Sequence, residues 1–242
     1  GDWSSDVCSS DLVAACETVL WVPFLAKPPT CDGLLNPGEW DAASTTLASG
    51  ATTGASVRAI QPRIHLGYDK ENLYVACYVP ILPAGSWLRA DAKQPDILEP
   101  LMRDDHVKFE IWPSAEPSAG TKYGSFDLQW NAYGVLADWH ARPGGSPDMK
   151  WSPGCNIRSV ADGLGWSCEL MIPLKSLRYG PYAATNAEGS AALTLPPQDG
   201  AAWRLRFASK VGDASNDFTI AAFFAADAEA MLRRAGELMK TK

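Results

Sequence analysis

The chain has 242 residues, of which 46% are apolar and 20% are charged, and its formal net charge is −7. This length and apolar content suit one globular domain with a sizeable core. The acidic balance and the lack of basic runs argue against a nucleic-acid partner. No apolar run is long enough, at about 18 residues, to span a membrane.

The first twelve residues, GDWSSDVCSSDL, are polar and show neither helical nor strand periodicity. They also lack the apolar core of a secretory leader. Asp2 through Leu12 match in full the translation of a common sequencing adapter, so we interpret residues 1–12 as an assembly artefact fused to a truncated reading frame. The Asp residues of this segment carry three of the seven net negative charges, which leaves −4 for the rest of the chain.

Strand patterns dominate the next part of the chain. RIHLGYDKENLYVACYV predicts a hairpin with strands over 63–68 and 73–79 and a polar turn over 69–72. DHVKFEIW alternates, so Val107, Phe109 and Ile111 share one face. The other face of this strand carries His106, Lys108, Glu110 and Trp112.

Two further hairpins are predicted over 124–140 and 156–174, followed by a strand over 203–209. Loops rich in Pro, Gly and Ser separate them at 83–100, 113–121, 142–154 and 180–201, and the first of these loops has room for one turn of helix. DAEAMLRRAGELMK, over 227–240, has the apolar periodicity of a helix. The pattern indicates an all-β fold, an antiparallel, jelly-roll-like β-sandwich over 13–225. A short C-terminal helix follows over 226–242, either as its end or as a truncated continuation.

Five Cys remain once Cys8 is set aside with the first segment, and no C-x-x-C spacing supports a zinc site. Cys77 and Cys168 lie among apolar strand residues, so we expect them in the core. One disulfide among Cys16, Cys31 and Cys155 stays open as an alternative to free thiols.

The string LVAAC, which ends at Cys16, is similar to a bacterial lipobox, although the apolar segment that precedes such a motif is absent. We therefore expect an extracellular, periplasmic or lipid-anchored protein whose signal peptide is missing from this sequence.

Six motifs then follow one another along the chain: PPTCDGLLNPGEWDAA, YDKENLYVACYV, RDDHVKFEIWP, YGSFDLQWNAYGVLADW, DGLGWSCELMIPLKSL and WRLRFAS. Together they resemble the family 9 carbohydrate-binding modules and the family 9-like, DOMON-type domains, over about residues 26–210. Those modules show a P-x-I-D-G-x-L-x-x-x-x-W motif, then a Y-D-x-x-x-L-Y-V hairpin and a D-x-V-E-I-F strand. An F-x-V-N-x-x-G hairpin and a W-x-x-E-x-x-I-P strand complete the series.

The resemblance implies a β-sandwich that holds a terminal sugar unit in a slot. Two Trp rings would clamp the sugar, since the axial C–H groups of a pyranose stack on aromatic faces. Polar strand residues would hydrogen-bond its hydroxyls.

The family's site residues change in this chain. Aligned on Asp105, the first clamp position holds Met102 instead of Trp. The strand Glu position holds Lys108, the basic position before the strand Asn holds Gln129, and the late-strand amide falls at Arg206 or Ala208. No Trp follows Trp203, so the second clamp has no counterpart.

We predict a non-catalytic carbohydrate-binding module that recognises a polysaccharide or oligosaccharide end and forms part of a larger exported protein for polysaccharide degradation. The candidate sugar-binding residues are Lys108, Gln129, Arg206, Met102, Asp105, Trp139 and Trp151. Lys108, Gln129 and Arg206 each alternate with core residues on their own strands, so we expect them on one exposed face. Two cationic heads beside an amide favour a ligand with a carboxylate, such as a uronic acid. Alternatively, Lys108 and Arg206 pair with Glu110 and Asp127 for little energy.

Two other function classes stay open: the appended domain of a fused glycoside hydrolase, and a structural sandwich that binds a protein. Glu110 and Asp127 are the candidate catalytic pair for the hydrolase, against the alternative of solvated carboxylates.

Aromatic and metal-ligating residues leave further alternatives. Trp87, Trp112, Trp139 and Trp151 are either sugar platforms or covers for the core edge, whereas Trp40, Trp166 and Trp203 fall at core positions. Met102 with His106 or His140 is the only candidate pair of haem ligands. We expect no cofactor, with calcium at Asp104, Asp105 and Asp138 as the alternative.

Overall fold

A computed structural model describes residues 18–47, 51–53, 62–81, 88–114, 123–183, 193–212 and 214–240. The segment interpreted as adapter sequence, the lipobox-like Cys16 and Trp87 lie outside this part of the chain.

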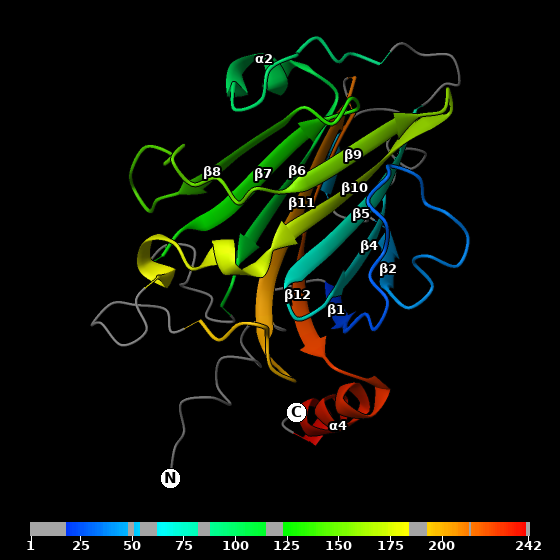
Figure 1. Cartoon of the computed structure of the whole chain (residues 1–242), viewed down its shortest axis with the longest axis vertical. Coiled ribbons are helices and arrows are strands. Elements are labelled where there is room, and N and C mark those ends of the chain that lie inside the picture. The colour runs from blue at the N-terminus through cyan, green and yellow to red at the C-terminus, as the bar shows by residue number, and fades with distance from the viewer. Residues whose placement is uncertain are drawn as a thin grey trace.

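Two β-sheets form the body of the described structure (Figure 1). The first sheet has seven strands there, in the order β1-β12-β11-β6-β7-β8, with β3 also paired to β12. Its strands are β1 (Thr18–Pro23), β3 (Ala51–Thr53), β6 (His106–Trp112), β7 (Ser125–Asn131), β8 (Leu136–Ala141), β11 (Ala202–Val211) and β12 (Ala214–Ala225).

The second sheet has five strands in the described residues, in the order β2-β4-β5-β10-β9. These are β2 (Ser44–Leu47), β4 (Arg63–Tyr68), β5 (Asn72–Pro80), β9 (Asn156–Ala161) and β10 (Gly165–Pro173). Strand pairs in both sheets are antiparallel, except that β1 runs parallel to β12. The predicted antiparallel β-sandwich is therefore confirmed.

Helices lie at the two ends of the sandwich. The short α2 (Leu98–Arg103) and the C-terminal α4 (Ala228–Lys240) occupy opposite ends (Figure 1), and α4 confirms the helix predicted from the apolar periodicity. Two 3₁₀ turns, η2 (Leu174–Leu177) and η3 (Gly180–Tyr182), follow β10. None of the helices within the described ranges has the length and apolar character needed to cross a membrane.

The core lies between the sheets and follows the predicted alternation. Val107, Phe109 and Ile111 of β6 are buried in the main cluster, which also holds Trp166 and Trp203. Trp40 packs in a second cluster with Leu25, Tyr74 and Ala76. These three Trp residues therefore have the core positions that the sequence predicted.

The four described cysteines differ in burial, and none of them forms a disulfide. Cys77 of β5 and Cys168 of β10 face each other in register and are fully buried, which confirms them as core residues. Cys31 and Cys155 are both free thiols. The alternative of a disulfide between those two is therefore wrong in this structure.

Candidate functional site

The polar residues predicted for the site lie on one face of the first sheet, the face that points away from the second sheet. Lys108 of β6 is opposite Gln129 of β7 in register, and Arg206 of β11 is opposite Glu110 of β6. Directly opposed residues project from the same side of a sheet. The alternation of these strands therefore predicted the shared face correctly.

Ion pairs connect this face across four strands. Lys108 Nζ lies 2.5 Å from Glu110 Oε1 and 2.9 Å from Asp127 Oδ2. One Arg206 amino group lies 3.1 Å from Glu110 Oε1, while Arg206 Nε donates to Asp217 at 2.7 Å and its second amino group pairs with the same carboxylate. We call these five residues the charged ladder; they alternate in sign in the order Asp127, Lys108, Glu110, Arg206, Asp217.

The pairing anticipated as the alternative to a uronic-acid site is thus present, with one change. Lys108 pairs with both predicted carboxylates, whereas Arg206 pairs with Glu110 and with Asp217 of β12. The sequence did not reveal Asp217, because β12 was not predicted as a strand and its register with β11 was therefore unknown.

Burial divides the charged ladder into an inner and an outer part. The side chains of Glu110 and Asp127 are only 6% and 4% exposed, while those of Arg206 and Asp217 are 37% and 46% exposed. Lys108, at 26%, is intermediate. The solvent-facing polar atoms therefore come from Arg206, Asp217 and Lys108, and the two buried carboxylates hold the cations in position.

Proton affinities within the charged ladder reflect this environment. Burial raises the pKa of Asp127 above its ordinary value and outweighs the opposing effect of Lys108. Burial alone would lower the pKa of Lys108, yet the carboxylates of Asp127 and Glu110 raise it above its ordinary value. Hydrogen bonds from Arg206 lower the pKa of Asp217. Lys108, Arg206 and Asp217 are accordingly charged at neutral pH.

Gln129 is on the predicted face but is only 3% exposed, so the expectation that it is exposed is wrong. Its Nε2 has no hydrogen-bond partner in the part of the chain that the structure describes. Trp139 of β8 is opposite Asp127 in register, and its ring centroid lies 5.1 Å from Lys108 Nζ. Trp139 is 5% exposed and packs against Leu101, Ala92 and Ala137, so its ring is largely covered by α2 and the segment before it.

Met102 and Asp105 are not part of the charged ladder. Met102 lies on α2 and is 55% exposed, so a thioether faces solvent at the position where the family has a Trp ring. Asp105 is 4% exposed and accepts hydrogen bonds from the backbone of Arg89 at 2.8 Å and Gly212 at 2.7 Å. The described contacts therefore make Asp105 an anchor between two loops.

Trp151 and Trp112 differ in burial. Trp151 is 2% exposed, packs on Phe126 at 4.8 Å between ring centroids and donates from Nε1 to Ser176 O at 2.9 Å. It is a core residue, because the chain after β8 folds back over Phe126. Trp112 is half-buried at the end of β6 under the Arg204 guanidinium, 5.1 Å from its ring centroid.

The described contacts bear on three alternatives: a glycosidase pair at Glu110 and Asp127, haem ligation, and calcium binding. Glu110 and Asp127 are direct neighbours, but both are held by Lys108. His140 is buried against Phe126 on the core side, away from the exposed Met102. Asp104 accepts from the amides of Asp91 and Ala92 and from Asn131. No group of three or more His, Cys, Asp or Glu side chains with metal-binding geometry occurs among the described residues.

Solved structures with the same architecture are carbohydrate-binding modules. A family 9 module from Caldicellulosiruptor kristjanssonii in complex with cellotriose is 11% identical and has a TM-score of 0.56, covering 88% of this chain and 96% of that one. Its complex with glucose gives 12% identity and a TM-score of 0.55, covering 87% and 98%. The chain has the family 9 fold.

A third solved structure of this family 9 fold, a candidate carbohydrate-binding protein from Bacteroides uniformis, is 12% identical with a TM-score of 0.59, covering 86% of this chain and 99% of that one. No protein-family model matches the sequence, and no curated protein is significantly similar to it. The likeness to family 9 modules therefore lies in the fold and in the order of the strand motifs.

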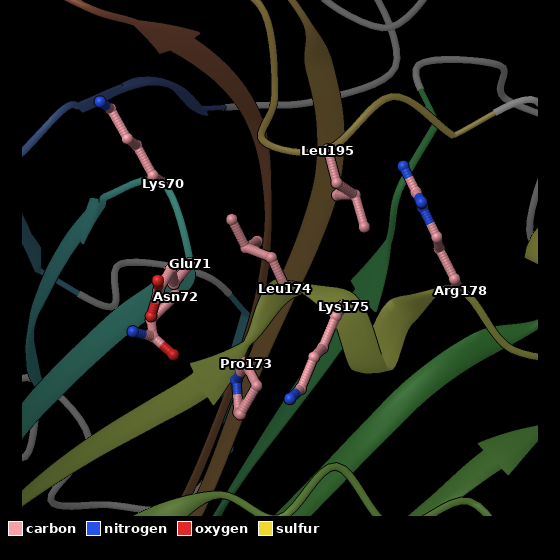
Figure 2. A pocket seen from close by; sticks show the side chains of 8 residues that line it. All are labelled: Lys70, Glu71, Asn72, Pro173, Leu174, Lys175, Arg178 and Leu195. Carbon is pink, nitrogen blue, oxygen red and sulfur yellow. The ribbon is translucent and has the colours of Figure 1, made fainter.

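A separate cleft of about 460 Å³ lies where the β4–β5 turn approaches the end of β10 and η2 (Figure 2). Its centre is apolar, formed by Leu174 and Leu195, and Lys70, Lys175 and Arg178 project from it in different directions (Figure 2). Specific ligand sites need convergent polar groups. We therefore place the candidate site of this family 9 fold on the charged ladder instead of in the cleft.

Proposed function

We propose that the chain is a non-catalytic carbohydrate-binding module and that its sugar binds on the charged ladder. The observation that supports this most directly is the alternation of cations and carboxylates across β7, β6, β11 and β12. A sugar hydroxyl both donates and accepts hydrogen bonds. A row of alternating fixed donors and acceptors is therefore complementary to the hydroxyl edge of a saccharide.

The ligand on this surface is a neutral saccharide. The charged ladder has two cations and three carboxylates, so its net charge is −1. A uronic acid would meet cations that are already neutralised, and it would add a like charge beside Asp217. The pairing thus removes the physical basis for the predicted uronic-acid ligand. Cellotriose and glucose, the ligands of the structural neighbours, are likewise neutral.

Each residue of the charged ladder has a distinct role in this proposal. Arg206 and Asp217 contact the sugar, because their side chains are the most exposed of the five. Lys108 contributes at the inner border, and Glu110 and Asp127 act as positioning residues. Gln129 Nε2, a buried donor without a partner among the described residues, is available to a ligand hydroxyl or to a bridging water.

The non-catalytic role is supported by the environment of Glu110 and Asp127. A glycosidase pair needs one carboxylic acid that can give up its proton and one free carboxylate. Here both groups share the same Lys108 ammonium and are almost completely buried. We propose further that the module is exported as part of a larger protein; the alternative is that it is the appended domain of a glycoside hydrolase.

Isothermal titration calorimetry with cellotriose tests the proposal. Arg206→Ala should weaken binding by about 1.5–3 kcal/mol, the usual contribution of hydrogen bonds to charged groups. The matched control is Arg178→Ala, which removes an exposed Arg from the cleft of Figure 2 and should bind like the unsubstituted protein. Equal loss in both variants, or tighter binding of a glucuronide than of cellotriose, would overturn the assignment.

A second experiment separates the module from an enzyme. The protein should release no reducing sugar from cellulose, xylan or β-glucan. Turnover that disappears in Glu110→Gln would favour the hydrolase instead.

A further inference from the structure

A second cavity, of about 350 Å³, lies at the side of the sandwich where the edge strand β8 approaches the segment before β9. Asp96, Asp138, Ser152 and Cys155 supply its polar lining, and Pro95, Val135 and Leu136 supply apolar surface. Asp138 is opposite Leu128 in register, so it projects toward the inside of the sandwich, away from the charged ladder. The cavity and the charged ladder are therefore separate sites.

Asp138 is unusual among the buried carboxylates of this chain. It is only 6% exposed, and it makes no hydrogen bond or ion pair within the described residues. Buried carboxylates normally have such partners. Asp104, Asp105, Asp127 and Glu169, which are buried to a similar degree, all have them.

The groups that face Asp138 make its isolation more costly. Asp96, from the segment before α2, adds a second negative charge, and Cys155, from the segment before β9, adds a thiol. Burial, followed by the charge of Asp96, raises the pKa of Asp138 to about 7. Burial raises the pKa of the Cys155 thiol as well, so it stays neutral and does not compensate the carboxylates. The cavity thus has an excess of acceptors and lacks a cation.

The donor set decides which cation fits. Calcium requires six to eight oxygen ligands, and no group of three His, Cys, Asp or Glu side chains with metal-binding geometry occurs among the described residues. An ammonium group has three donors, and the two carboxylates with the Ser152 hydroxyl match that number. The apolar part of the lining suits the carbon body of a small molecule.

We propose that this cavity binds a primary ammonium group on a compact ring, as in an amino sugar with a free amine. Its volume lies within the usual range for small-molecule sites, about 300–1,000 Å³. The proposal does not depend on sugar binding at the charged ladder, because no residue is shared between the two sites.

The position of Asp138 on the edge strand β8 offers a competing explanation for its inward-pointing carboxylate, which is unpaired among the described residues. Inward-pointing charges on edge strands prevent pairing between the sheets of separate molecules. This explanation predicts that Asp138→Asn increases self-association and leaves ligand binding unchanged, so the two explanations can be separated by experiment.

The test is a calorimetric titration of the full chain with glucosamine at neutral pH, with glucose and N-acetylglucosamine as matched ligands. Glucosamine should bind at least tenfold more tightly than either, since only glucosamine carries the ammonium group. Asp138→Asn should weaken glucosamine binding at least tenfold, whereas the control Asp91→Asn, which changes a side chain that is 78% exposed, should not.

Two further results keep the test specific. Arg206→Ala should retain glucosamine binding at the cavity, which separates this site from the charged ladder. The proposal is overturned if the three sugars bind alike, if Asp138→Asn alters only self-association, or if calcium binds and competes with glucosamine.

Discussion

The indole Nε1 of Trp40 donates a hydrogen bond of 2.8 Å to the buried carboxylate of Glu169. The backbone amides of Asp32 and Gly33 donate to the other oxygen of the same carboxylate, at 2.9 and 2.8 Å. Two sequence motifs, D-G-x-L-x-x-x-x-W near the start of the domain and W-x-x-E-x-x-I-P on β10, therefore meet at one buried group. These two motifs therefore hold the fold together at a carboxylate on β10 of the second sheet, away from the charged ladder.

Glu169→Ala should lower the free energy of unfolding by about 2–4 kcal/mol, because three donors, two of them buried, lose their acceptor. Urea denaturation followed by Trp fluorescence measures this loss. Glu71→Ala, which removes an exposed carboxylate from the β4–β5 turn, is the control and should change stability by less than about 0.5 kcal/mol. Similar effects of the two substitutions would show that the network does not stabilise the fold.

The two cations of the charged ladder should differ in their effect on stability. Lys108→Met leaves the carboxylates of Glu110 and Asp127 buried beside each other with one fewer cation, which should cost about 2–4 kcal/mol. Arg206→Ala breaks a pair that is much more exposed and should cost about 1 kcal/mol or less. Thermal or urea unfolding of both variants gives the comparison, and a larger loss in Arg206→Ala would contradict the burial order.

Asp138 predicts a specific pH dependence of stability. Its pKa in the folded chain is raised from 3.8 to about 7, so the folded state holds this proton in a pH range where the unfolded state has released it. The contribution of this group to stability therefore falls as pH rises from about 4 to about 7. Relative to Asp138→Asn, the unsubstituted protein should lose about 2 kcal/mol across that range, after allowance for partial solvent screening.

Urea denaturation of the unsubstituted protein and of Asp138→Asn at several pH values gives the pH dependence of the stability contributed by Asp138. The difference between the two proteins cancels the contributions of the other titrating groups. A difference that stays flat from acid to neutral pH would show that Asp138 has an ordinary proton affinity.

Asp105, predicted as a sugar-binding residue, should behave as a structural one. Asp105→Ala removes the acceptor for the amides of Arg89 and Gly212 and should destabilise the protein by about 1–3 kcal/mol. At a temperature where the variant remains folded, its affinity for cellotriose should be unchanged. If Asp105→Ala is as stable as the unsubstituted protein but loses affinity for cellotriose, Asp105 is a sugar-binding residue.

Alternation along single strands was enough to predict most of the fold and the side of the sheet that carries the site. Strand β12 escaped prediction because it lies between β1 and β11, and its run from Ile220 to Ala225 is buried on both faces. Without an exposed face, a strand loses its alternating pattern. Asp217, which completes the charged ladder, was missed together with its strand.

Exposure was harder to predict than the face on which a residue lies. Gln129 and Trp139 alternate correctly, yet α2 and the segment before it cover part of the polar face through Leu101 and Ala92. Trp151 becomes a core residue because its loop returns over Phe126. The burial of these residues depends on where a neighbouring segment packs, and the alternation along a strand does not predict where such a segment packs.

The most direct test of sugar binding at the charged ladder is an NMR titration of the isotope-labelled protein with cellotriose. The largest chemical-shift changes should come from Lys108, Arg206 and Asp217, accompanied by the side-chain amide of Gln129, while Lys70, Lys175 and Arg178 around the cleft of Figure 2 stay unchanged. Saturable shifts confined to that cleft, or no shifts at millimolar cellotriose, would contradict the account.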